Sequence, residues 1–287
     1  MDLQILKFSN ELLRIIAFWR VGILKLICIN HFSLCIRRLK IFRIRVHSIE
    51  TFSTQDGPGI RLVVFLQGCH FKCLYCHNPD TIPEKGGKMM EDEEIIAYIN
   101  KQRGYIKNGG ITFSGGEPTL QAKNLIPLFK KIKEMGVHIC IDSNGFILTP
   151  DVKELLSYVD LVLLDIKHID NEMHKKLTGQ PNVHTLQMLE YLESDENRKH
   201  NNTKYWVRHV YVPGWTAIEK YVHQLGQFLQ NRKNLEEITI LPYHTLGVEK
   251  WESMGWKYGL EGVKPPSAES VAKAKEILAS YVDCRVR

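Results

Sequence analysis

The chain has 287 residues, of which 44% are hydrophobic and 24% are charged. This ordinary globular composition excludes collagen-like, mucin-like and wholly disordered classes. The net charge of +6 would indicate an anionic partner, such as nucleic acid or a membrane, if it were evenly spread. Residues 1–45 hold nine basic and two acidic residues, a net charge of +7, which leaves −1 for the remaining 242 residues. The basicity therefore belongs to one end of the chain.

Residues 1–43 form a basic, amphipathic N-terminal extension. Arg20 and Lys25 interrupt its apolar stretches, so no uncharged run approaches the roughly 20 apolar residues of a spanning helix. It lacks the small-residue cleavage site of a secretory signal and the serine-rich composition of a transit peptide. A surface anchor and a partner-binding arm are alternatives, but we favour an idiosyncratic extension or a start codon placed too early. The predicted domains are this extension and a core over residues 44–287.

From residue 44 onward, short apolar runs rich in β-branched residues alternate with helical patterns. The runs are nearly continuous in apolar residues, as buried parallel strands are, and lie at residues 61–66, 111–114, 137–142, 161–166, 205–212 and 237–241. Helical patterns cover residues 91–107, a segment ending at 136, and residues 151–158, 182–193, 217–231 and 267–281. The polar residues 194–204 between them are predicted to be a surface loop. This alternation predicts an α/β domain with a parallel sheet.

Polar and glycine-rich segments follow five of the six predicted strands. They are Cys69, the run Ser114-Gly115-Gly116-Glu117, the run Asp142-Ser143-Asn144-Gly145, the run Asp165-Ile166-Lys167, and Pro242-Tyr243-His244. In parallel sheets, ligands and catalytic groups collect at the carboxyl ends of the strands. We therefore expect these five strand ends to converge on one site.

Three of the seven cysteines, Cys69, Cys73 and Cys76, form a Cys-x3-Cys-x2-Cys run. The odd total and the missing secretory signal argue against a disulfide framework. Three thiolates on one loop suit a [4Fe-4S] cluster that leaves one iron free for substrate. A zinc site with His77 or another histidine as fourth ligand is the alternative, although structural zinc sites usually use two separated ligand pairs. The other cysteines are expected to be buried or incidental thiols: Cys28, Cys35, Cys140 and Cys284.

The cysteine spacing, with Tyr75 before the last cysteine and Gly-Gly-Glu after the second strand, resembles the radical S-adenosylmethionine superfamily. Within it, the resemblance is to the activating enzymes of pyruvate formate-lyase, from about Arg45 to the C-terminus. The ordered segments that carry it are Asp56-Gly57-Pro58-Gly59-Ile60-Arg61, residues 65–69, residues 75–81, residues 142–146, residues 164–167, residues 212–215, residues 241–247 and residues 262–266.

The resemblance implies a partial (β/α)6 barrel of the radical S-adenosylmethionine type, with a [4Fe-4S] cluster at its mouth. In this family the cluster, held by three cysteines, binds S-adenosylmethionine and cleaves it reductively to a 5′-deoxyadenosyl radical. That radical abstracts an α-hydrogen from a backbone glycine of a glycyl radical enzyme. The partner expected here is the formate C-acetyltransferase known as pyruvate formate-lyase. Reduced flavodoxin or ferredoxin is the implied electron donor, and an anaerobic cytoplasm is the expected setting.

The resemblance also implies which residues bind S-adenosylmethionine: Tyr75, Cys76, His77, Gly115, Gly116, Glu117, Asp165, Ile166, Lys167, Arg208 and His244. Each group has a plainer interpretation. Gly-Gly-Glu followed by Pro118 could be an ordinary strand-to-helix turn. Asp165 and Lys167 lie on one face of a strand and could form a surface ion pair, as could Arg208. A single histidine such as His244 is more often structural.

Two further sites are implied by the resemblance. Asp142, Ser143 and Asp165 match positions that help to bind a monovalent cation, although the usual residue at Ser143 is threonine. The loop Asp56-Gly57-Pro58-Gly59 matches one that holds the glycine-bearing loop of the partner protein; alone, Gly-Pro-Gly favours a tight turn.

Two alternative functions are retained. The first is an activase of a different glycyl radical enzyme; several of these insert a cysteine-rich domain after the first cysteine loop, whereas the 38 residues from His77 to Ser114 contain no cysteine. The second is a zinc-bound nucleic-acid module. The net charge of −1 outside residues 1–45 argues against a nucleic-acid partner.

Overall fold

The computed structural model describes residues 43–287. The predictions for the extension, including those for Cys28 and Cys35, concern residues that lie almost entirely outside this range. Six parallel strands are neighbours in chain order within one sheet: β2 (Arg61–Leu66), β4 (Gly110–Gly115), β5 (Ile139–Ser143), β6 (Leu161–Asp165), β7 (Lys204–Tyr211) and β8 (Leu235–Pro242). All six predicted strands are confirmed, with ends within two residues of the prediction.

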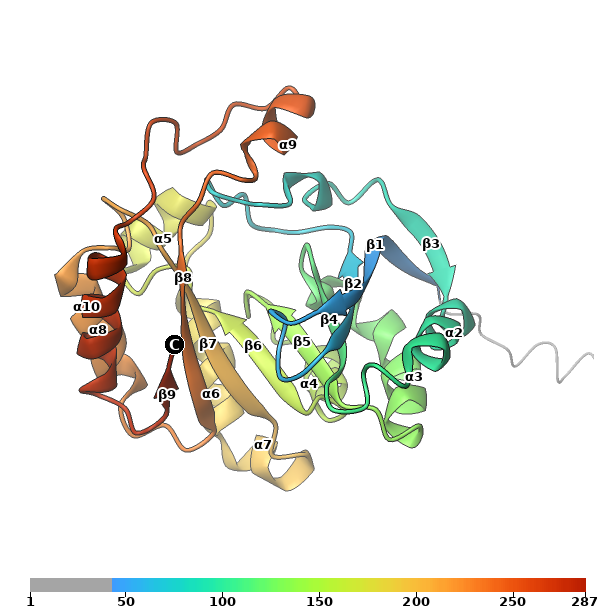
Figure 1. Ribbon diagram of the computed structural model, residues 1–287. Coiled ribbons are helices and arrows are strands. Elements are labelled where there is room, and N and C mark those ends of the chain that lie inside the picture. Colours follow the sequence, from blue (N-terminus) through green and yellow to red (C-terminus); the bar gives the residue numbers. More distant parts are fainter. Residues whose placement is uncertain (1–42) are drawn as a thin grey trace, which may run out of the picture. The chain divides into compact units, whose positions relative to one another are not determined.

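Three further strands, which were not predicted, extend the sheet at its edges. β1 (Arg43–Ser53) pairs antiparallel with β2, and β3 (Lys88–Glu91) pairs antiparallel with β1. At the other edge β9 (Arg285–Val286) pairs in parallel with β8. Within the described residues β3 and β9 are the two ends of the strand order, so the curved sheet in Figure 1 does not close. The expected partial barrel is confirmed.

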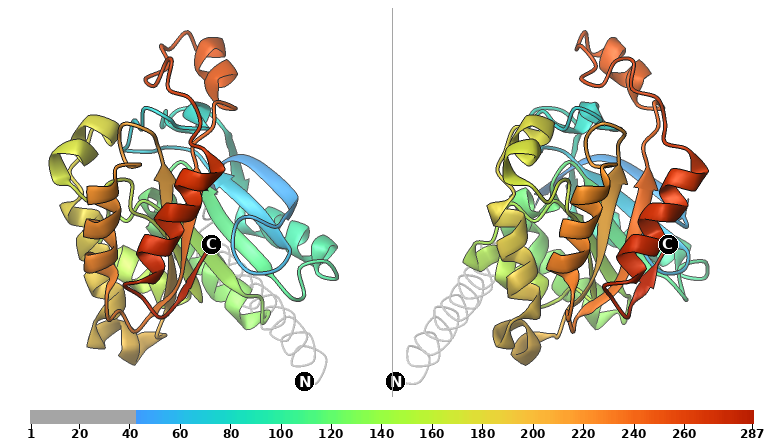
Figure 2. Two further views of the ribbon diagram at one scale, coloured as in Figure 1. Left: turned by 60° about the vertical axis from the view of Figure 1, so that its left-hand side comes forward. Right: turned by 90° about the vertical axis from the view of Figure 1, so that its left-hand side faces the viewer.

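Helices cover the outer face of the curved sheet (Figures 1 and 2). Those that correspond to predicted segments are α2 (Asp92–Gln102), α3 (Ala122–Glu134), α4 (Pro150–Leu156), α6 (Val183–Glu193), α8 (Glu219–Leu229) and α10 (Ala268–Ala279). Their apolar faces and the outward side chains of the strands form the main core, with Leu125, Phe129 and Ile132 of α3 fully buried. None of the helices in residues 43–287 has the length and hydropathy required to cross a membrane.

The inward-facing side chains of the strands form a second apolar layer inside the barrel. Cys140, Leu161 and Leu163 are buried there, and Trp206 packs against them. Because successive side chains of a strand point to opposite faces, Asp142 and Asp165, two residues further along β5 and β6, face the same interior. The prediction that Cys140 is a buried thiol is confirmed.

The prediction of a surface loop over residues 194–204 is wrong, because this segment contains the helix α7 (Asp195–His200). The Ser194 side chain accepts a hydrogen bond from the backbone N–H of Asn197, which caps the helix. Asp195 and Glu196 occupy the first turn, and basic residues occupy the last, an order that complements the helix dipole. The polar residues that indicated a loop belong to a short, capped helix on which only Asn197 is buried.

Four short elements near the carboxyl ends of the strands were also not predicted. They are the 3-10 helices η1 (Pro79–Thr81) and η2 (Pro118–Gln121) and the α-helices α5 (Asn171–Thr178) and α9 (Val248–Ser253). α5 starts at a cap in which Asp170 Oδ1 accepts from the N–H of Met173 at 2.9 Å. It ends at Gly179, which adopts the left-handed conformation at φ 81°.

Candidate active site

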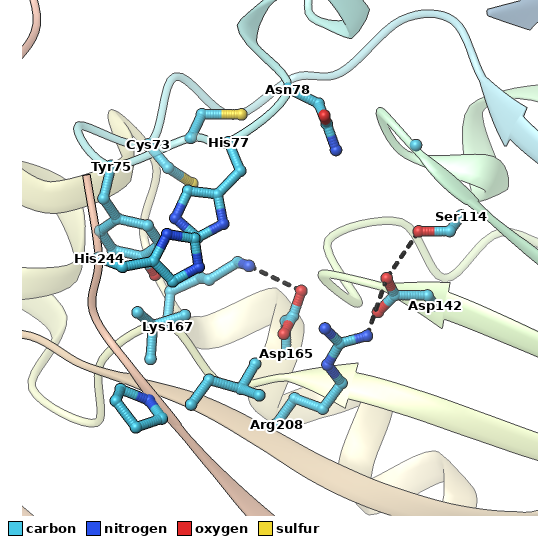
Figure 3. A pocket seen from close by; sticks show the side chains of 15 residues that line it. Cys73, Tyr75, His77, Asn78, Ser114, Asp142, Asp165, Lys167, Arg208 and His244 are labelled. Carbon is cyan, nitrogen blue, oxygen red and sulfur yellow. Dashed lines mark hydrogen bonds and ion pairs between the residues drawn. The ribbon is translucent and has the colours of Figure 1, made fainter. Parts of the chain in front are cut away.

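A cavity of about 410 Å³ lies at the carboxyl ends of the parallel strands. β4, β5, β6, β7 and β8 each contribute a side chain to its lining, namely Ser114, Asp142, Asp165, Arg208 and Leu241. The remaining lining residues are Cys73, Tyr75, Cys76, His77, Asn78, Gly115, Lys167, Val210, Pro242 and His244. Figure 3 shows the polar side chains pointing toward this space. Four of the five predicted strand ends therefore converge on this cavity, and β7 joins them; Cys69, which follows β2, lines the smaller cavity described below.

The cysteine loop (residues 69–76) follows β2 and is held by backbone hydrogen bonds. The N–H groups of Lys72 and Leu74 each donate at 2.9 Å to carbonyls of α5, those of Thr178 and Leu177. Cys69 N–H donates to the carbonyl of Ile82 at 3.0 Å. Phe71, Cys73 and Tyr75 are buried in an apolar cluster with Leu177. The loop that carries the three thiols is thus fixed on both sides.

The three thiols line a second, smaller cavity of about 90 Å³, together with Gly115 and Gly116. Burial raises the pKa of Cys69 to about 12 and also raises the pKa values of Cys73 and Cys76. A buried thiolate needs a positive partner, which iron supplies when it binds. The three thiols share one enclosed space, and burial disfavours their charged form when no metal is bound. Both properties fit the ligand set of an iron–sulfur cluster.

The side chains of the described residues do not gather in any group of three or more His, Cys, Asp or Glu that could hold a single metal ion. A single zinc ion requires its ligands at about 2.0–2.3 Å from one point. The three thiols instead surround a shared space. An enclosed space lined by three thiols suits a cluster, in which three of the irons each take one thiolate and the fourth has none.

Charged side chains alternate along the floor of the larger cavity. Lys167 Nζ donates to Asp165 Oδ2 at 2.6 Å, and Arg208 Nη1 lies 3.2 Å from Asp142 Oδ2 (Figure 3). Burial opposes the charge of Lys167, but Asp165 and the neighbouring groups raise its pKa well above the usual value. Burial raises the pKa of Asp142, and Arg208 opposes this rise. Asp165 and Arg208 do form ion pairs, but the alternative that these pairs lie on the surface is wrong, because all four side chains line the cavity.

Several buried polar atoms that border the cavity have no hydrogen-bond partner within residues 43–287. They are Tyr75 Oη, His77 Nε2 and Asp142 Oδ1; Arg208 Nη1 also lacks a hydrogen bond, although it forms the ion pair with Asp142 Oδ2 at 3.2 Å. Leaving a buried polar atom unpaired costs about 1–3 kcal/mol. A polar, charged ligand would satisfy such atoms, which is the character of S-adenosylmethionine.

His77 and His244 stack at the cavity, with ring centroids 4.0 Å apart and an angle of 17° between the ring planes. Burial, followed by the proximity of His244, lowers the pKa of His77 to about 4. His77 is therefore neutral near pH 7, and the stacked rings present a flat surface beside the cysteine loop. Such a surface suits an aromatic ring of a ligand.

Gly115, the last residue of β4, and Gly116, which follows it, allow close packing against the end of β2 and the residues before the cysteine loop. Gly115 has φ +106°, and a Cβ there would lie 2.3 Å from the backbone nitrogen of Leu66. A Cβ on Gly116 would lie 2.0 Å from the carbonyl oxygen of Gly68. Any side chain would therefore push β4 away from the start of the loop.

Glu117 does not line either cavity. Its fully buried carboxylate accepts from Thr119 N at 3.0 Å, from Ser143 Oγ at 2.7 Å and from Asn144 N at 2.8 Å. Burial raises its pKa. In this structure Glu117 joins the segment after β4 to that after β5. Ile166 is also buried away from the cavity, and its carbonyl accepts from His209 Nδ1 at 2.7 Å. The predicted contacts of Glu117 and Ile166 with the ligand remain predictions.

The loop of residues 56–59 lies beside the cavity without lining it. Asp56 Oδ1 is 3.9 Å from Arg208 Nη1, so the loop and the cavity share one cation. Gly59 has φ +71°, and a Cβ there would lie 2.2 Å from the carbonyl oxygen of Asn108. The glycine is thus required by close packing as well as by the turn.

Three site residues had no role in the sequence predictions. Asn144 Nδ2 lies 3.8 Å from Cys69 Sγ, and Ser114 Oγ donates to Asp142 Oδ2 at 2.7 Å. Trp251 Nε1 donates to the carbonyl of Cys76 at 2.8 Å. Ser114 and Asn144 stand inside motifs that the sequence displays, whereas Trp251 lies 175 positions from its partner.

Comparison with known proteins now places the chain in a family. It is 43% identical to pyruvate formate-lyase 1-activating enzyme of Escherichia coli strain K12 over 241 residues, which cover 83% of this chain and 96% of the relative. It is 46% identical to pyruvate formate-lyase-activating enzyme of Staphylococcus epidermidis, over 80% of this chain and 92% of the relative. The chain belongs to the pyruvate formate-lyase activating enzymes. Residues 55–189 also match the family described as 4Fe-4S single cluster domain.

Solved structures agree with membership of this family at the level of the fold. A domain of pyruvate-formate lyase-activating enzyme from Bacteroides vulgatus superposes with a TM-score of 0.50 at 26% identity, covering 62% of this chain and 98% of that one. Streptococcus suis SuiB bound to S-adenosylmethionine gives a TM-score of 0.56 at 16% identity, covering 76% and 47%. The second likeness concerns the fold alone.

Proposed function

We propose that the chain activates pyruvate formate-lyase by installing a glycyl radical on it under anaerobic conditions. The observation that carries this proposal is the pair of adjoining cavities, one lined by three thiols and the other by charged strand ends and unpaired polar atoms. Relatives that cover most of the chain are named for this activity.

Cys69, Cys73 and Cys76 would hold a [4Fe-4S] cluster and leave one iron for S-adenosylmethionine. When bound, the cluster would supply the electron for reductive cleavage of S-adenosylmethionine, and the resulting radical chemistry would remove an α-hydrogen from the partner's glycine. The chain's own residues orient these groups and exclude water from them. Burial of Phe71, Cys73 and Tyr75 serves the second purpose.

The residues around the larger cavity would bind S-adenosylmethionine. Lys167 and Arg208, which line this cavity, would bind its carboxylate as cations, and Asp165 would accept from its ribose hydroxyls. Tyr75 and the stacked rings of His77 and His244 would contact the nucleoside. Gly115 and Gly116 would line the methionine end. Glu117 would support this end through Ser143 and Asn144, to which its carboxylate is bound, and a contact of Ile166 would be made by its backbone. These assignments are proposals for ligand-binding experiments.

A monovalent cation would bind beside the ligand at Asp142, Ser143 and Asp165. The unpaired Asp142 Oδ1 is the atom that supports this proposal. Ser143 Oγ donates a hydrogen bond to Glu117 Oε1 at 2.7 Å. A lone pair of the same oxygen would coordinate the cation, and the hydrogen bond would be kept.

The loop of residues 56–59 would receive the partner's glycine-bearing loop, because its glycines permit close approach of another backbone. Reduced flavodoxin or ferredoxin would provide the electron, and the cytoplasm would be the setting. The predicted domain boundary, between an extension of residues 1–43 and a core of residues 44–287, remains a prediction.

The test is an anaerobic activation assay with reductant, S-adenosylmethionine and inactive pyruvate formate-lyase. We expect the wild-type chain to restore acetyl transfer by the partner, and Cys73→Ala to abolish both activation and reductive cleavage of S-adenosylmethionine. Cys284→Ala is the matched control, since this thiol lies near the C-terminus and lines neither cavity described above. Activation of a different glycyl radical enzyme, with none of pyruvate formate-lyase, would move the function to the rival activase.

Metal analysis separates the proposal from the zinc-module alternative. Protein reconstituted without oxygen should contain about four irons and four sulfides per chain. Zinc without labile sulfide in anaerobically purified protein would contradict the cluster assignment.

A further inference from the structure

Arg61, the first residue of β2, is fully buried inside the barrel. Within residues 43–287 Arg61 forms no salt bridge, and its hydrogen-bond partners are Thr112, His138 and the backbone carbonyls of Pro58 and Ile111. Its partners are instead uncharged groups: Nε donates to Thr112 Oγ1 at 2.5 Å, and Nη2 donates to the carbonyl of Ile111 at 2.5 Å. A buried cation is tolerated only where hydrogen bonds replace its hydration. The partners of Arg61 therefore constrain its position closely.

Arg61 and Thr112, which are hydrogen-bonded to each other, each contact the loop of residues 56–59. Arg61 Nη1 donates to the carbonyl of Pro58 at 3.2 Å. Thr112 Oγ1, which accepts from Arg61, donates its own proton to the carbonyl of Asp56 at 2.6 Å. The loop backbone is thus held at two carbonyls by side chains that rise from β2 and β4.

The loop also packs directly on Arg61. Gly57 has φ +122°, and a Cβ there would lie 3.0 Å from both Arg61 Cδ and Cys140 Sγ. On its other side the Asp56 carboxylate accepts from Ser53 Oγ at 2.5 Å and faces Arg208 at 3.9 Å. A shift of Arg61 or Thr112 would therefore move the loop relative to the larger cavity, which Arg208 lines.

We propose that Arg61 and Thr112 are positioning residues for the protein substrate: they hold the 56–59 loop where the partner's glycine segment must dock. Neither side chain lines the larger or the smaller cavity. They contact the loop and not the cavities, so we expect their replacement to change recognition of the partner more than cleavage of S-adenosylmethionine, which the loop reaches only through the 3.9 Å approach of Asp56 to Arg208. This inference rests on the proposed function, because it requires that a glycyl radical enzyme be the substrate.

The test compares Thr112→Val with Thr112→Ser. Valine keeps the shape of threonine but removes the hydroxyl, leaving Arg61 Nε and the Asp56 carbonyl unpaired, whereas serine keeps both hydrogen bonds. With pyruvate formate-lyase as substrate, we expect Thr112→Val to raise KM for the partner about fivefold to tenfold with little change in kcat. Reductive cleavage of S-adenosylmethionine without the partner should stay within about twofold of wild type, and Thr112→Ser should behave as wild type.

A second variant, Arg61→Lys, covers the case in which Thr112→Val does not fold. Lysine keeps the charge but loses the geometry that reaches Thr112, Pro58 and Ile111 together, so the same selective rise in KM is expected. An unchanged KM in the folded variants, or an equal loss of partner-free cleavage, would overturn the inference. Failure of the wild-type chain to activate any glycyl radical enzyme would overturn the proposed function, and this inference with it.

Discussion

At the scale of single residues, close backbone packing determines where the two cavities lie. Gly116 N–H donates to the carbonyl of Leu66 at 2.8 Å, and Glu117 N–H donates to that of Gly68 at 2.7 Å. These bonds join the end of β4 to the start of the cysteine loop, and they are possible only because residue 116 has no side chain. The position of the thiols therefore depends on a glycine that binds no metal.

We expect Gly116→Ala to reduce the iron bound per chain at least twofold, because its Cβ would lie 2.0 Å from the Gly68 carbonyl and displace the adjoining loop. Overpacking of this kind costs about 1–3 kcal/mol. Gly104→Ala is the control, since no atom lies within 4 Å of a Cβ there. Iron and sulfide analysis after identical reconstitution provides the measurement. Equal iron content in both variants would contradict this role of Gly116.

The sequence predicted the identity of many site residues but not all of their contacts. Cys69, Lys167 and Arg208 stand at strand ends or on the loop, and the parallel-sheet rule places such residues together. Glu117 was predicted to contact S-adenosylmethionine, yet its carboxylate accepts from Thr119, Ser143 and Asn144. The direction of one side chain depends on the register of neighbouring loops, which a single sequence does not display.

At the scale of elements, two short helices hold the cysteine loop from opposite sides. The last turn of α5 accepts the backbone N–H groups of Lys72 and Leu74. α9 supplies Trp251, whose indole donates to the carbonyl of Cys76. Neither helix was predicted, because α9 has six residues and α5 has eight, too few for a clear hydrophobic period. Their stability comes from tertiary packing.

Trp251→Phe should weaken retention of the cluster, because it removes one buried hydrogen bond to the loop while keeping an aromatic ring. A single hydrogen bond contributes about 0.5–1.5 kcal/mol, which corresponds to roughly twofold to twelvefold faster loss of iron to a chelator. Trp256→Phe is the matched control; Trp256 packs edge-on against Trp251 and is 36% exposed. The rate is followed by the decay of cluster absorbance without oxygen. Equal rates of iron loss in the two variants would show that the hydrogen bond from α9 does not help to retain the cluster.

At the scale of the whole molecule, buried neutral histidines link stability to pH. His209 is buried, donates from Nδ1 to the carbonyl of Ile166, and has its pKa lowered by burial from 6.5 to about 4. Below pH 6.5 the unfolded chain therefore binds this proton more readily than the folded chain. Stability contributed by neutral His209 is present above pH 6.5 and is lost as the pH falls toward 4.

We predict that the free energy of unfolding falls between pH 7 and pH 5, with about 2 kcal/mol of that fall due to His209. His209→Gln should remove this share of the pH dependence, since glutamine does not titrate. The exposed His200 gives the control, His200→Gln. Anaerobic denaturant titration at the two pH values measures the difference. A pH dependence in His209→Gln equal to that of wild type would contradict the assignment.

The same scale shows what the sequence could predict of the architecture. The six parallel strands could be predicted, because a strand buried on both faces is a nearly continuous apolar run in the sequence. β1 was missed, since only Ile44 and Val46 in its first half are buried and most of its second half is exposed. β9 has two residues and exists through its pairing with β8. Elements that bury little of their own surface left little pattern in the sequence.

Electron paramagnetic resonance tests the central claim most directly. The chain is incubated without oxygen with reductant, S-adenosylmethionine and pyruvate formate-lyase, and the spectrum of the partner is recorded. The account predicts a glycyl radical signal that requires all components and is absent with Cys73→Ala. Reductive cleavage of S-adenosylmethionine without a glycyl signal on any glycyl radical enzyme would contradict it.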